Sequence, residues 1–537
     1  MRRHDTGFHR QGALMSDSWL PPDGVRRVSD IIKVSVGMFK GGDLRCPAAD
    51  ALKARGYQPE RGGRRRQERL EQFAFGPFMA ACDARSRAGD EPDERPRRSK
   101  PIHDGLREWT AHAVESYVAA FPEEPDHVMS EVETPWRYSH VATESSPFGK
   151  GEYQLTVWGR CLRSRDGTVR ELRLPVNRLG RQQPPESFIA AAALVLAEGA
   201  PGPRPERVRI TEFALLDGKV RPLFDGTRDE ALAAYRSRGR AALTALLDSQ
   251  EYRPGVGCAD CAYTAVCPVL RRAPGLLGVD GPGPVRRWWS VTNGRNYQIC
   301  PARDQMRRLH LPTADEVERA AAVERGRALH AYLAERHGSG SPRLCTVRIP
   351  EQWVPEGFEL PESERVLGTK LLRGHAAVCP MRLVRDATDV RGEPRVVRYD
   401  TTAEVVVVAK PDLLYRDRGA WVWRETKTTS RDRHGARPLL EEYPQLALAV
   451  MLLARGDLGG TPGRARIEFE VLRPGGADLE IIDPYIPETR ATAGTVVHEM
   501  VSRWLRDEEY APRPGRACDR CDTARWCTSG TAFQAAR

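Results

Sequence analysis

Two carboxylates and one lysine are spaced so that they could act on a single phosphate group. Segment 403–430 contains two β-rich runs separated by a turn signal at 416–419, which predicts a hairpin. Asp412 ends the first expected strand, and Glu425 and Lys427 share one face of the second. Such carboxylates suit Mg²⁺ or Mn²⁺, which polarises a water, while the ammonium of Lys427 orients that water or neutralises developing charge. The competing interpretation is a solvated edge strand on which Glu and Lys alternate.

A histidine upstream is a further candidate ligand. The run VERGRALHAYLAERHG has helical periodicity and places His330 near one end of an amphipathic face. A lone histidine on a helix is most often a packed or surface residue. Its combination with Asp412 and Glu425 is what makes His330 a candidate for the metal.

Eight of the twelve cysteines fall into two sets that share one pattern. Each set is a C-x2-C-x5-C triplet preceded, more than two hundred residues upstream, by a lone Cys-Pro. The first set is Cys46, Cys258, Cys261 and Cys267, and the second set is Cys300, Cys518, Cys521 and Cys527. Reduced cytosolic thiols are expected to be ligands and not disulfides. Iron–sulfur clusters accept four thiolates from scattered positions, whereas structural zinc uses two short pairs, so the spacing favours 4Fe–4S clusters and keeps zinc as the alternative.

The remaining cysteines lack partners at ligand spacing. They are predicted to be small, buried apolar residues. This group consists of Cys82, Cys161, Cys345 and Cys379.

The repeated cysteine pattern is accompanied by other internal similarity. The run RVRITEF from Arg207 resembles RARIEFE from Arg464, and the apolar helical run from Phe188 parallels the run from Gln445. The chain is therefore predicted to contain two copies of one unit. The expected organisation is a tail (1–27), a first unit (28–273) with an exposed or disordered insertion near 62–100, a Pro/Gly-rich linker (274–287) and a second unit (288–537).

Composition limits the class of protein. The 537 residues are 40% hydrophobic and 29% charged, which is typical of a soluble globular protein, and the net charge of +10 favours a polyanionic partner. The longest apolar runs are about half the length of a membrane span, and no signal peptide is visible. We therefore expect no membrane association and a cytoplasmic location.

These features occur in an order that resembles the RecB-like branch of the PD-(D/E)XK nuclease superfamily, in the iron–sulfur form found in the AddB nuclease subunit and the CRISPR-adaptation exonuclease. The segment SVTNGRNYQICP, which ends at Cys300 and Pro301, is similar to that family's opening motif. The second cysteine triplet matches the family's closing motif. The matches between these ends are Gly326 and His330 of G-x-x-x-H, Asp412 at the metal-binding Asp, Glu425 and Lys427 of (D/E)-x-K, and Gln445 of the Q-x-x-x-Y helix, in which Ala449 replaces Tyr.

The resemblance implies an α/β protein of two tandem restriction-endonuclease-like domains, each a mixed central sheet flanked by helices. In the second domain it implies that His330, Asp412 and Glu425 bind Mg²⁺ or Mn²⁺, that Lys427 and Gln445 belong to the catalytic site, and that a 4Fe–4S cluster joins the domain's ends. The implied reaction is metal-dependent phosphodiester hydrolysis of DNA, as an exonuclease on single-stranded or end DNA, in repair, CRISPR or antiphage defence.

The first copy departs from the pattern. Aligned on the active hairpin, it carries Cys161, Arg173 and Pro175 at the Asp, Glu and Lys positions, and Trp109 at the His position. It is predicted to be an inactive nuclease-like domain.

Two other functions stay open: a non-catalytic iron–sulfur scaffold or sensor that binds nucleic acid, and a zinc-stapled regulator. No G-x-x-x-x-G-K-[ST] motif is present, so any unwinding of DNA would require a helicase or another repair or defence subunit as partner.

Overall fold

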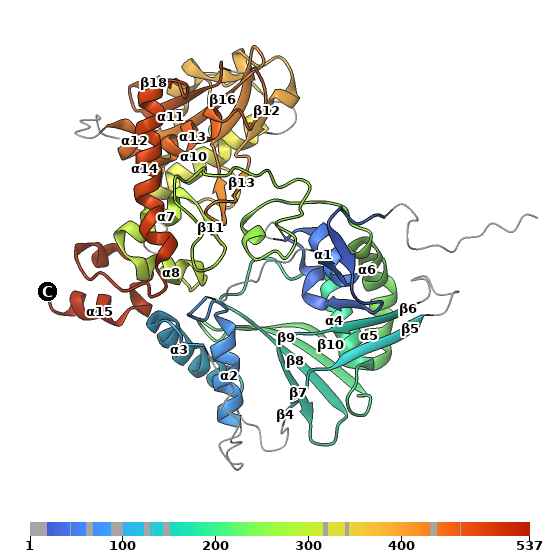
Figure 1. The fold of residues 1–537 in the computed structure, drawn as a ribbon. Coiled ribbons are helices and arrows are strands. Elements are labelled where there is room, and N and C mark those ends of the chain that lie inside the picture. Colours follow the sequence, from blue (N-terminus) through green and yellow to red (C-terminus); the bar gives the residue numbers. More distant parts are fainter. Residues whose placement is uncertain are drawn as a thin grey trace, which may run out of the picture. The chain divides into compact units, whose positions relative to one another are not determined.

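The computed structural model describes residues 19–42, 45–60, 68–86, 100–122, 129–132, 134–142, 151–314, 320–338, 343–429, 438–461 and 463–537. The chain divides into two compact units (Figure 1). Unit 1 takes most of the chain up to Val269, and unit 2 comprises Leu270–Arg537 together with the short segments 66–70 and 103–105. Of the helices in the described residues, none is both long and apolar enough to span a membrane.

The strands among the described residues of unit 1 form three sheets. The small sheet pairs β1 (Val25–Arg27) with β3 (Tyr57–Pro59). The three-stranded sheet has the order β2 (Ile32–Ser35), β6 (Gly151–Thr156), β5 (Arg137–Ala142). The five-stranded sheet has the order β10 (Val220–Thr227), β9 (Arg207–Ala214), β8 (Val169–Val176), β7 (Arg160–Ser164), β4 (Met129–Glu131).

The helices of unit 1 include one that is buried on all sides. The helix α4 (Glu186–Glu198) is apolar around its whole circumference, which is the pattern of a core helix, and residues 190–197 are all buried. The other helices of this part of the chain are α1 (Pro47–Ala54), α2 (Phe75–Ser86), α3 (Asp104–Ala120), α5 (Arg228–Ala234) and α6 (Arg240–Leu247).

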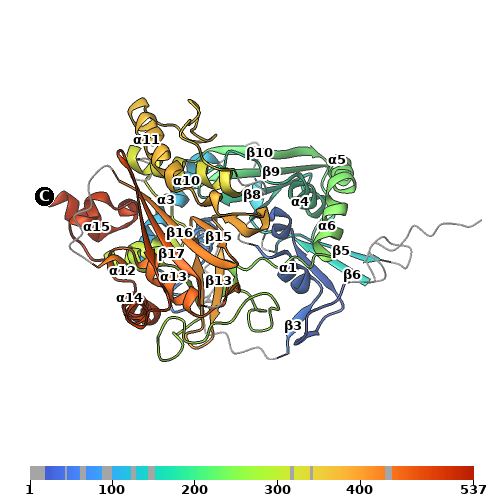
Figure 2. The same ribbon diagram turned by 90° about the horizontal axis from the view of Figure 1, so that it is seen from above.

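Unit 2 contains two sheets among its described residues. The three-stranded sheet has the order β11 (Arg287–Trp289), β14 (Val405–Ala409), β13 (Val396–Asp400). The five-stranded sheet has the order β12 (Val390–Gly392), β15 (Leu413–Asp417), β16 (Ala420–Thr428), β17 (Arg466–Arg473), β18 (Gly476–Ile482), and Figure 2 shows β15, β16 and β17 side by side.

Helices cover both faces of this five-stranded sheet. One face packs on α10 (Ala321–Gly338) and α11 (Glu362–Val378), and the other packs on α13 (Pro444–Ala454) and α14 (Pro487–Arg506). The remaining α-helices in the part of unit 2 that the structure describes are α7 (Val291–Ile299), α8 (Pro301–Arg308), α12 (Leu439–Glu442) and α15 (Thr528–Ala535). The protein is therefore a mixed α/β fold in which mixed sheets are flanked by helices, as the sequence predicts.

The sheets of the two units have the same connections. In unit 1, β8 runs parallel to β9 and antiparallel to β7, and β9 runs antiparallel to β10. In unit 2, β16 runs parallel to β17 and antiparallel to β15, and β17 runs antiparallel to β18. The three-stranded sheets agree as well, because β2 and β11 each add in parallel to the second strand of an antiparallel pair, β6 and β14 respectively.

The expected hairpin forms, but its first strand is shorter than expected. Arg418 and Gly419 have positive φ angles and form the turn between β15 and β16. The run that precedes Pro411 is a separate strand, β14, and it belongs to the other sheet. Asp412 therefore precedes the first hairpin strand and does not end it, because the chain crosses between sheets at Pro411, which has no N–H to continue a ladder.

Part of the expected insertion is ordered. The helix α2 lies within 62–100, where the sequence predicted an exposed or disordered excursion. Phe78 of this helix is fully buried and its ring contacts those of Tyr117 and Phe213. The expectation was wrong for this helix because one apolar face, too short to show clear periodicity, packs into unit 1.

Candidate active site

Strand β16 sorts its side chains between the two faces of the sheet. Trp421 and Trp423 belong to the core that contains α13, whereas Val422 belongs to the core that contains α10 and α11. Glu425 continues the first series, and its Oε1 accepts a hydrogen bond of 3.0 Å from Nε1 of Trp423. The period-two pattern of a strand thus holds Glu425 in a nearly buried position, with a side chain that is 5% exposed.

Strand pairing brings Asp412 to Glu425. Leu413 lies opposite Arg424 in the β15–β16 ladder, so Asp412, one residue earlier, lies beside Glu425. The Oδ2 atom of Asp412 accepts a hydrogen bond of 2.7 Å from the backbone N–H of Thr426. The Nζ atom of Lys427 is 3.8 Å from Oδ2 of Asp412 and 3.5 Å from Oε2 of Glu425. The structure therefore brings the two carboxylates and the ammonium together.

His330 reaches the same place from α10. Its Nδ1 atom lies 3.2 Å from Oδ1 of Asp412. Burial disfavours the imidazolium, but the hydrogen bond to Asp412 and the charge of Asp412 outweigh burial and raise the pKa of His330. Burial likewise opposes ionisation of Asp412, but its hydrogen bonds to His330 and to the N–H of Thr426, together with the charges of His330 and Lys427, outweigh burial and lower the pKa of Asp412.

Glu393 is a site residue that the sequence analysis missed. Within the described part of the chain, donor atoms of His330, Glu393 and Asp412 all lie within 4.8 Å of one another, and Glu425 is not in this group. Glu393 directly follows β12, whose residue Gly392 lies opposite Leu413, so the ladder places Glu393 beside Asp412. No periodicity or motif marks this glutamate, because only the pairing of β12 with β15 brings it to the site.

The donor set fits a hard divalent cation. Carboxylate oxygens are the ligands that Mg²⁺ and Mn²⁺ prefer, and one imidazole is compatible with Mn²⁺. When bound, such an ion supplies Lewis acidity and an activated water. His330, Asp412 and either Glu393 or Glu425 are the residues that would hold it.

Gln445 lies at the start of α13, and a further polar residue accompanies it. Its Oε1 atom accepts a hydrogen bond of 2.8 Å from Nη2 of Arg295, which also donates to the backbone carbonyl of Glu442. Burial lowers the pKa of Arg295, and the charge of Glu425 opposes this effect. Arg295 is therefore within electrostatic range of Glu425. Besides Gln445, it is a candidate contact for an anionic substrate, and the sequence analysis did not identify it.

Burial shifts the pKa of the Glu425 carboxyl upward. Burial, and then the charge of Asp412, raise the pKa of Glu425 to about 7. The pKa of Glu425 is higher in the folded protein than in the unfolded chain. Ionisation of Glu425 therefore lowers the free energy of unfolding as the pH rises from about 4.5 through about 7.

Glu425→Gln should therefore stabilise the metal-free protein at alkaline pH. We expect its melting temperature in a chelator to exceed that of the wild type by several degrees at pH 8, and the difference to shrink toward pH 5. Thermal unfolding across this pH range measures the effect. A difference independent of pH would mean that the Glu425 carboxylate is not destabilised in the folded state.

The thiols of the second cysteine set converge in unit 2. Cys300, Cys518, Cys521 and Cys527 line one pocket. Burial, and to a smaller extent the charges of the other three thiols, raise the pKa of Cys527. The backbone N–H groups of Arg513 and Gly530 donate hydrogen bonds of 3.4 and 3.3 Å to the sulfurs of Cys300 and Cys527.

The first set converges in the same way in unit 1. Burial, followed by the charges of Cys258, Cys46 and Cys267, raises the pKa of Cys261 to about 11. The backbone N–H of Arg253 donates a 3.4 Å hydrogen bond to the sulfur of Cys46. Arg253 and Arg513 both stand five residues before the first cysteine of their triplet, so the same contact occurs in both units.

Strand registers identify the residues of unit 1 that stand where the carboxylates stand in unit 2. When the RVRI run of β9 is aligned with the RARI run of β17, Glu212 takes the position of Phe469. Leu174 pairs with Glu212, and Glu425 pairs with Phe469, so Leu174 is the counterpart of Glu425. Gly159 precedes β7 beside Leu174 as Asp412 precedes β15 beside Glu425. At Gly159 φ is +147°, and a Cβ would lie 2.8 Å from the carbonyl oxygen of Arg173. Neither position of unit 1 carries a carboxylate.

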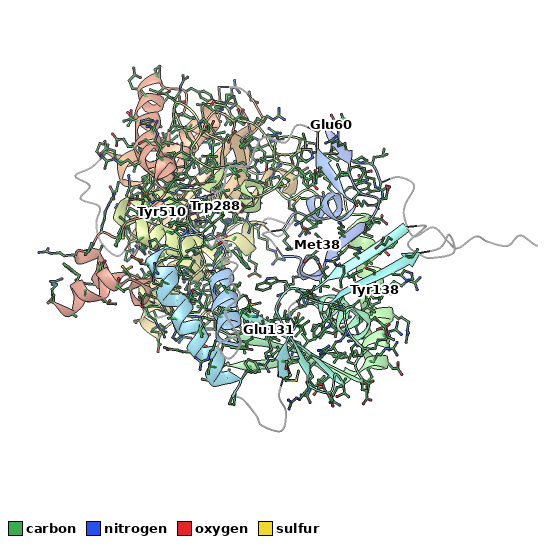
Figure 3. All side chains as sticks on the ribbon, turned by 60° about the horizontal axis from the view of Figure 1, so that its bottom comes forward. Met38, Glu60, Glu131, Tyr138, Trp288 and Tyr510 are labelled. Carbon is green, nitrogen blue, oxygen red and sulfur yellow. The ribbon has the colours of Figure 1, made fainter. Side chains whose placement is uncertain are left out.

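The sequence alignment of these positions was displaced. It placed Cys161 and Arg173 at the metal positions, but Cys161 is buried in the unit 1 core and Arg173 bonds the hydroxyl of Tyr117 at 3.0 Å. Nearby, buried Arg160 donates to Asp83 and to Glu131, which is labelled in Figure 3. The alignment was displaced by two residues from Gly159 and by one residue from Leu174, and the one-residue slip reverses the face of the strand, which a single sequence could not resolve.

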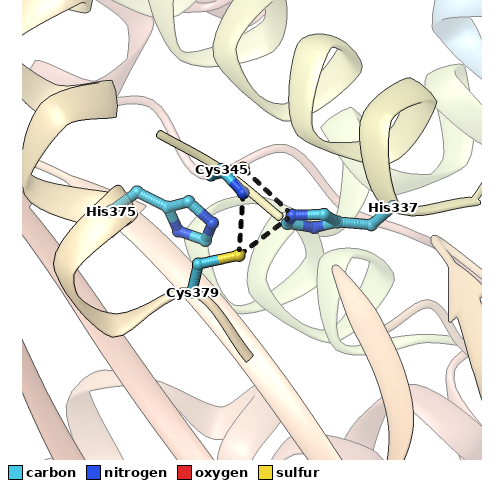
Figure 4. A group of neighbouring side chains, drawn as sticks. All are labelled: His337, Cys345, His375 and Cys379. Carbon is cyan, nitrogen blue, oxygen red and sulfur yellow. Dashed lines mark hydrogen bonds between the residues drawn. The ribbon is translucent and has the colours of Figure 1, made fainter. Parts of the chain in front are cut away.

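Cys345 and Cys379 are buried as expected, but they are not isolated. They lie against His337 and His375, with donor atoms of all four side chains within 4.8 Å of one another (Figure 4). The spacings His337-x7-Cys345 and His375-x3-Cys379 are short pairs that could have signalled a metal site in the sequence.

Residues 288–528 match the PD-(D/E)XK nuclease superfamily, so unit 2 contains a domain of that superfamily. The search of curated proteins gave no match. Among solved structures, “Putative exonuclease” from Eubacterium rectale is 15% identical, with a TM-score of 0.30 and coverage of 44% of this chain and 86% of that chain. SSO0001 is 16% identical, with a TM-score of 0.20 and coverage of 32% and 72%.

His330→Ala should impair metal use less than Asp412→Ala. An imidazole is the more dispensable ligand for a hard cation that prefers oxygen. We expect His330→Ala to retain cleavage at raised Mn²⁺ concentration and Asp412→Ala to stay inactive. A Mn²⁺ titration of cleavage by both variants measures this, and a wild-type titration curve for His330→Ala would exclude a ligand role.

Proposed function

We propose that unit 2 is a divalent-metal-dependent DNA nuclease that hydrolyses phosphodiester bonds. The observation that carries the proposal is the convergence of Asp412, Glu425, Lys427 and His330 at one end of the sheet of a PD-(D/E)XK domain. Structural ion pairs alone do not require two carboxylates, an imidazole and a lysine to meet at one partly buried end of a sheet.

Each polar residue of this site has a proposed role in the reaction. The cation is held by Asp412, His330 and one of the two glutamates, Glu425 or Glu393. The ammonium of Lys427, 3.5 Å from Glu425, faces the same space and is suited to orient the attacking water or to stabilise charge that develops on the phosphate. Arg295 and Gln445, which are hydrogen-bonded to each other, are suited to position the DNA backbone, since a guanidinium group pairs well with phosphate oxygens.

We also propose that unit 1 is a decayed copy of the same domain. The identical sheet connections and the repeated contact from an arginine N–H to the Cys-Pro sulfur support this relationship. Gly159 and Leu174 at the carboxylate positions make unit 1 inactive, so it serves as a binding or docking domain.

Each set of four cysteines is proposed to hold a 4Fe–4S cluster. Among the described residues, neither set appears among the groups whose donors all lie within 4.8 Å, whereas a single zinc ion needs donors about 3.3–3.8 Å apart. A cluster separates its ligands more widely because several irons stand between them. Hydrogen bonds from backbone N–H groups to the sulfurs, as at Cys46 and Cys300, are also typical of cluster ligands.

The nuclease activity is tested on the full chain. Protein purified without oxygen is incubated with labelled single-stranded and duplex DNA in Mn²⁺, Mg²⁺ or a chelator. We expect cleavage that requires the divalent ion. Metal-independent cleavage, or DNA binding without cleavage under all conditions, would overturn the proposal, and the second result would identify a non-catalytic scaffold.

A further inference from the structure

Four metal-binding side chains meet in the interior of unit 2, on the α10 and α11 side of the sheet. His337 ends α10, Cys345 follows it, His375 lies in the last turn of α11, and Cys379 caps that helix (Figure 4). The four residues are between 1% and 5% exposed. They form two short pairs, which is the arrangement that structural zinc sites use.

The distances between these side chains suit one ion. Nε2 of His337 lies 3.3 Å from the sulfur of Cys345 and 3.7 Å from the sulfur of Cys379. In a tetrahedral site with bonds of about 2.0–2.3 Å, neighbouring donors lie about 3.3–3.8 Å apart. A cluster with several irons would hold its donors farther apart than these.

We propose that His337, Cys345, His375 and Cys379 bind one structural Zn²⁺. Two thiolates and two neutral imidazoles give tetrahedral S₂N₂ coordination, which zinc favours. The two thiolates balance the charge of the ion, so the filled site is neutral, as a buried position requires.

Glu470 completes the site from β17. Its Oε1 atom lies 2.7 Å from Nδ1 of His375, and it is fully buried. When Nδ1–H of His375 donates this hydrogen bond, the lone pair of Nε2 is left for the metal. Nε2 is buried and has no hydrogen-bond partner among the residues that the structure describes. A carboxylate that orients a histidine ligand in this way is a regular part of zinc sites. Nη1 of Arg424 lies 3.6 Å from Oε2 of Glu470 and offsets part of this charge, while Nε and Nη2 of Arg424 donate hydrogen bonds to Glu468.

The zinc site is linked to the proposed nuclease site by short contacts. Oε2 of Glu470 accepts a 2.9 Å hydrogen bond from Oγ1 of Thr426, which lies between Glu425 and Lys427. His337 lies two helical turns after His330 on α10. The ion thus anchors both the helix that carries His330 and the strand that carries the carboxylate and the lysine.

Metal analysis of the intact wild-type protein tests the site. We expect about one zinc per chain and, at the zinc absorption edge, a shell of two sulfurs at about 2.3 Å and two nitrogens at about 2.0 Å. Lack of zinc after expression in zinc-supplemented medium would overturn the proposal. A shell of four sulfurs would do so as well, because it would place zinc at a Cys₄ set. A disulfide between Cys345 and Cys379 would contradict it too.

Variants give an independent measurement. Cys345→Ala should lose the zinc and keep the iron of the wild type, and Cys161→Ala, which removes a buried thiol of unit 1, should keep both. Glu470→Gln should keep the fold and weaken zinc about 10- to 100-fold in competition with a chelator. Unchanged zinc affinity in Glu470→Gln together with full zinc in Cys345→Ala would show that the ion binds elsewhere.

Discussion

Lys427→Ala is expected to lower Mn²⁺-dependent DNA cleavage by about 10²–10³-fold, because it removes a charge that acts on the phosphate in the transition state. Asp412→Asn should be at least as damaging, since Asp412 meets His330, Glu393 and Lys427. Asparagine keeps an oxygen that can accept the N–H of Thr426, so the fold should persist. Single-turnover cleavage of labelled DNA measures both effects.

A matched control is available within the same domain. Lys370 of α11 is exposed, and Lys370→Ala removes the same charge from unit 2 away from the site. It should cleave as the wild type does. Undiminished cleavage by Lys427→Ala, in protein with wild-type melting temperature, would remove the proposed mechanism, whereas equal losses in both lysine variants would point to general DNA attraction.

Cys518→Ala is expected to destabilise unit 2 and to reduce iron from about eight to about four atoms per chain, if both sets hold 4Fe–4S clusters. The second set joins the start of unit 2 at Cys300 to its end, and metal binding across such a long loop is coupled to folding. Because the active-site strands lie within this loop, cleavage should fall together with the melting temperature of unit 2.

The equivalent cysteine of unit 1 provides the matched control. Cys258→Ala should also halve the iron, but Mn²⁺-dependent cleavage should persist, because the carboxylates all belong to unit 2. Iron analysis, unfolding and cleavage assays on both variants distinguish the outcomes. A wild-type chain with about four irons that Cys258→Ala does not lower would mean that unit 1 has lost its cluster. Complete loss of cleavage in Cys258→Ala would mean that unit 1 contributes to catalysis.

Local patterns in the sequence were sufficient for several features. Alternation along 420–428 placed Glu425 on the Trp423 side of its strand, and the turn signal at 416–419 marked the hairpin. The apolar runs from Phe188 and Gln445 form buried helices. These inferences succeed because each depends on the period of a single element or on the conformational preferences of a few neighbouring residues.

Features that depend on strand pairing were missed or displaced. Glu393 reaches Asp412 only because β12 pairs with β15, and the true counterparts of the carboxylates in unit 1, Gly159 and Leu174, follow from ladder registers. Side chains in a strand alternate with period two, so a shift by one residue, invisible in one sequence, reverses the face.

The sequence by itself determined the two cysteine sets and the identities of Asp412, Glu425 and Lys427 as partners, because recurring spacing and strand parity are properties of the chain. The mixed α/β class was implied by the resemblance to a known family. Only the tertiary structure decided that His337 and His375 meet Cys345 and Cys379. Those four residues come from the ends of two helices and a connecting segment, and helix packing, which no local pattern encodes, brings them within 4.8 Å of one another.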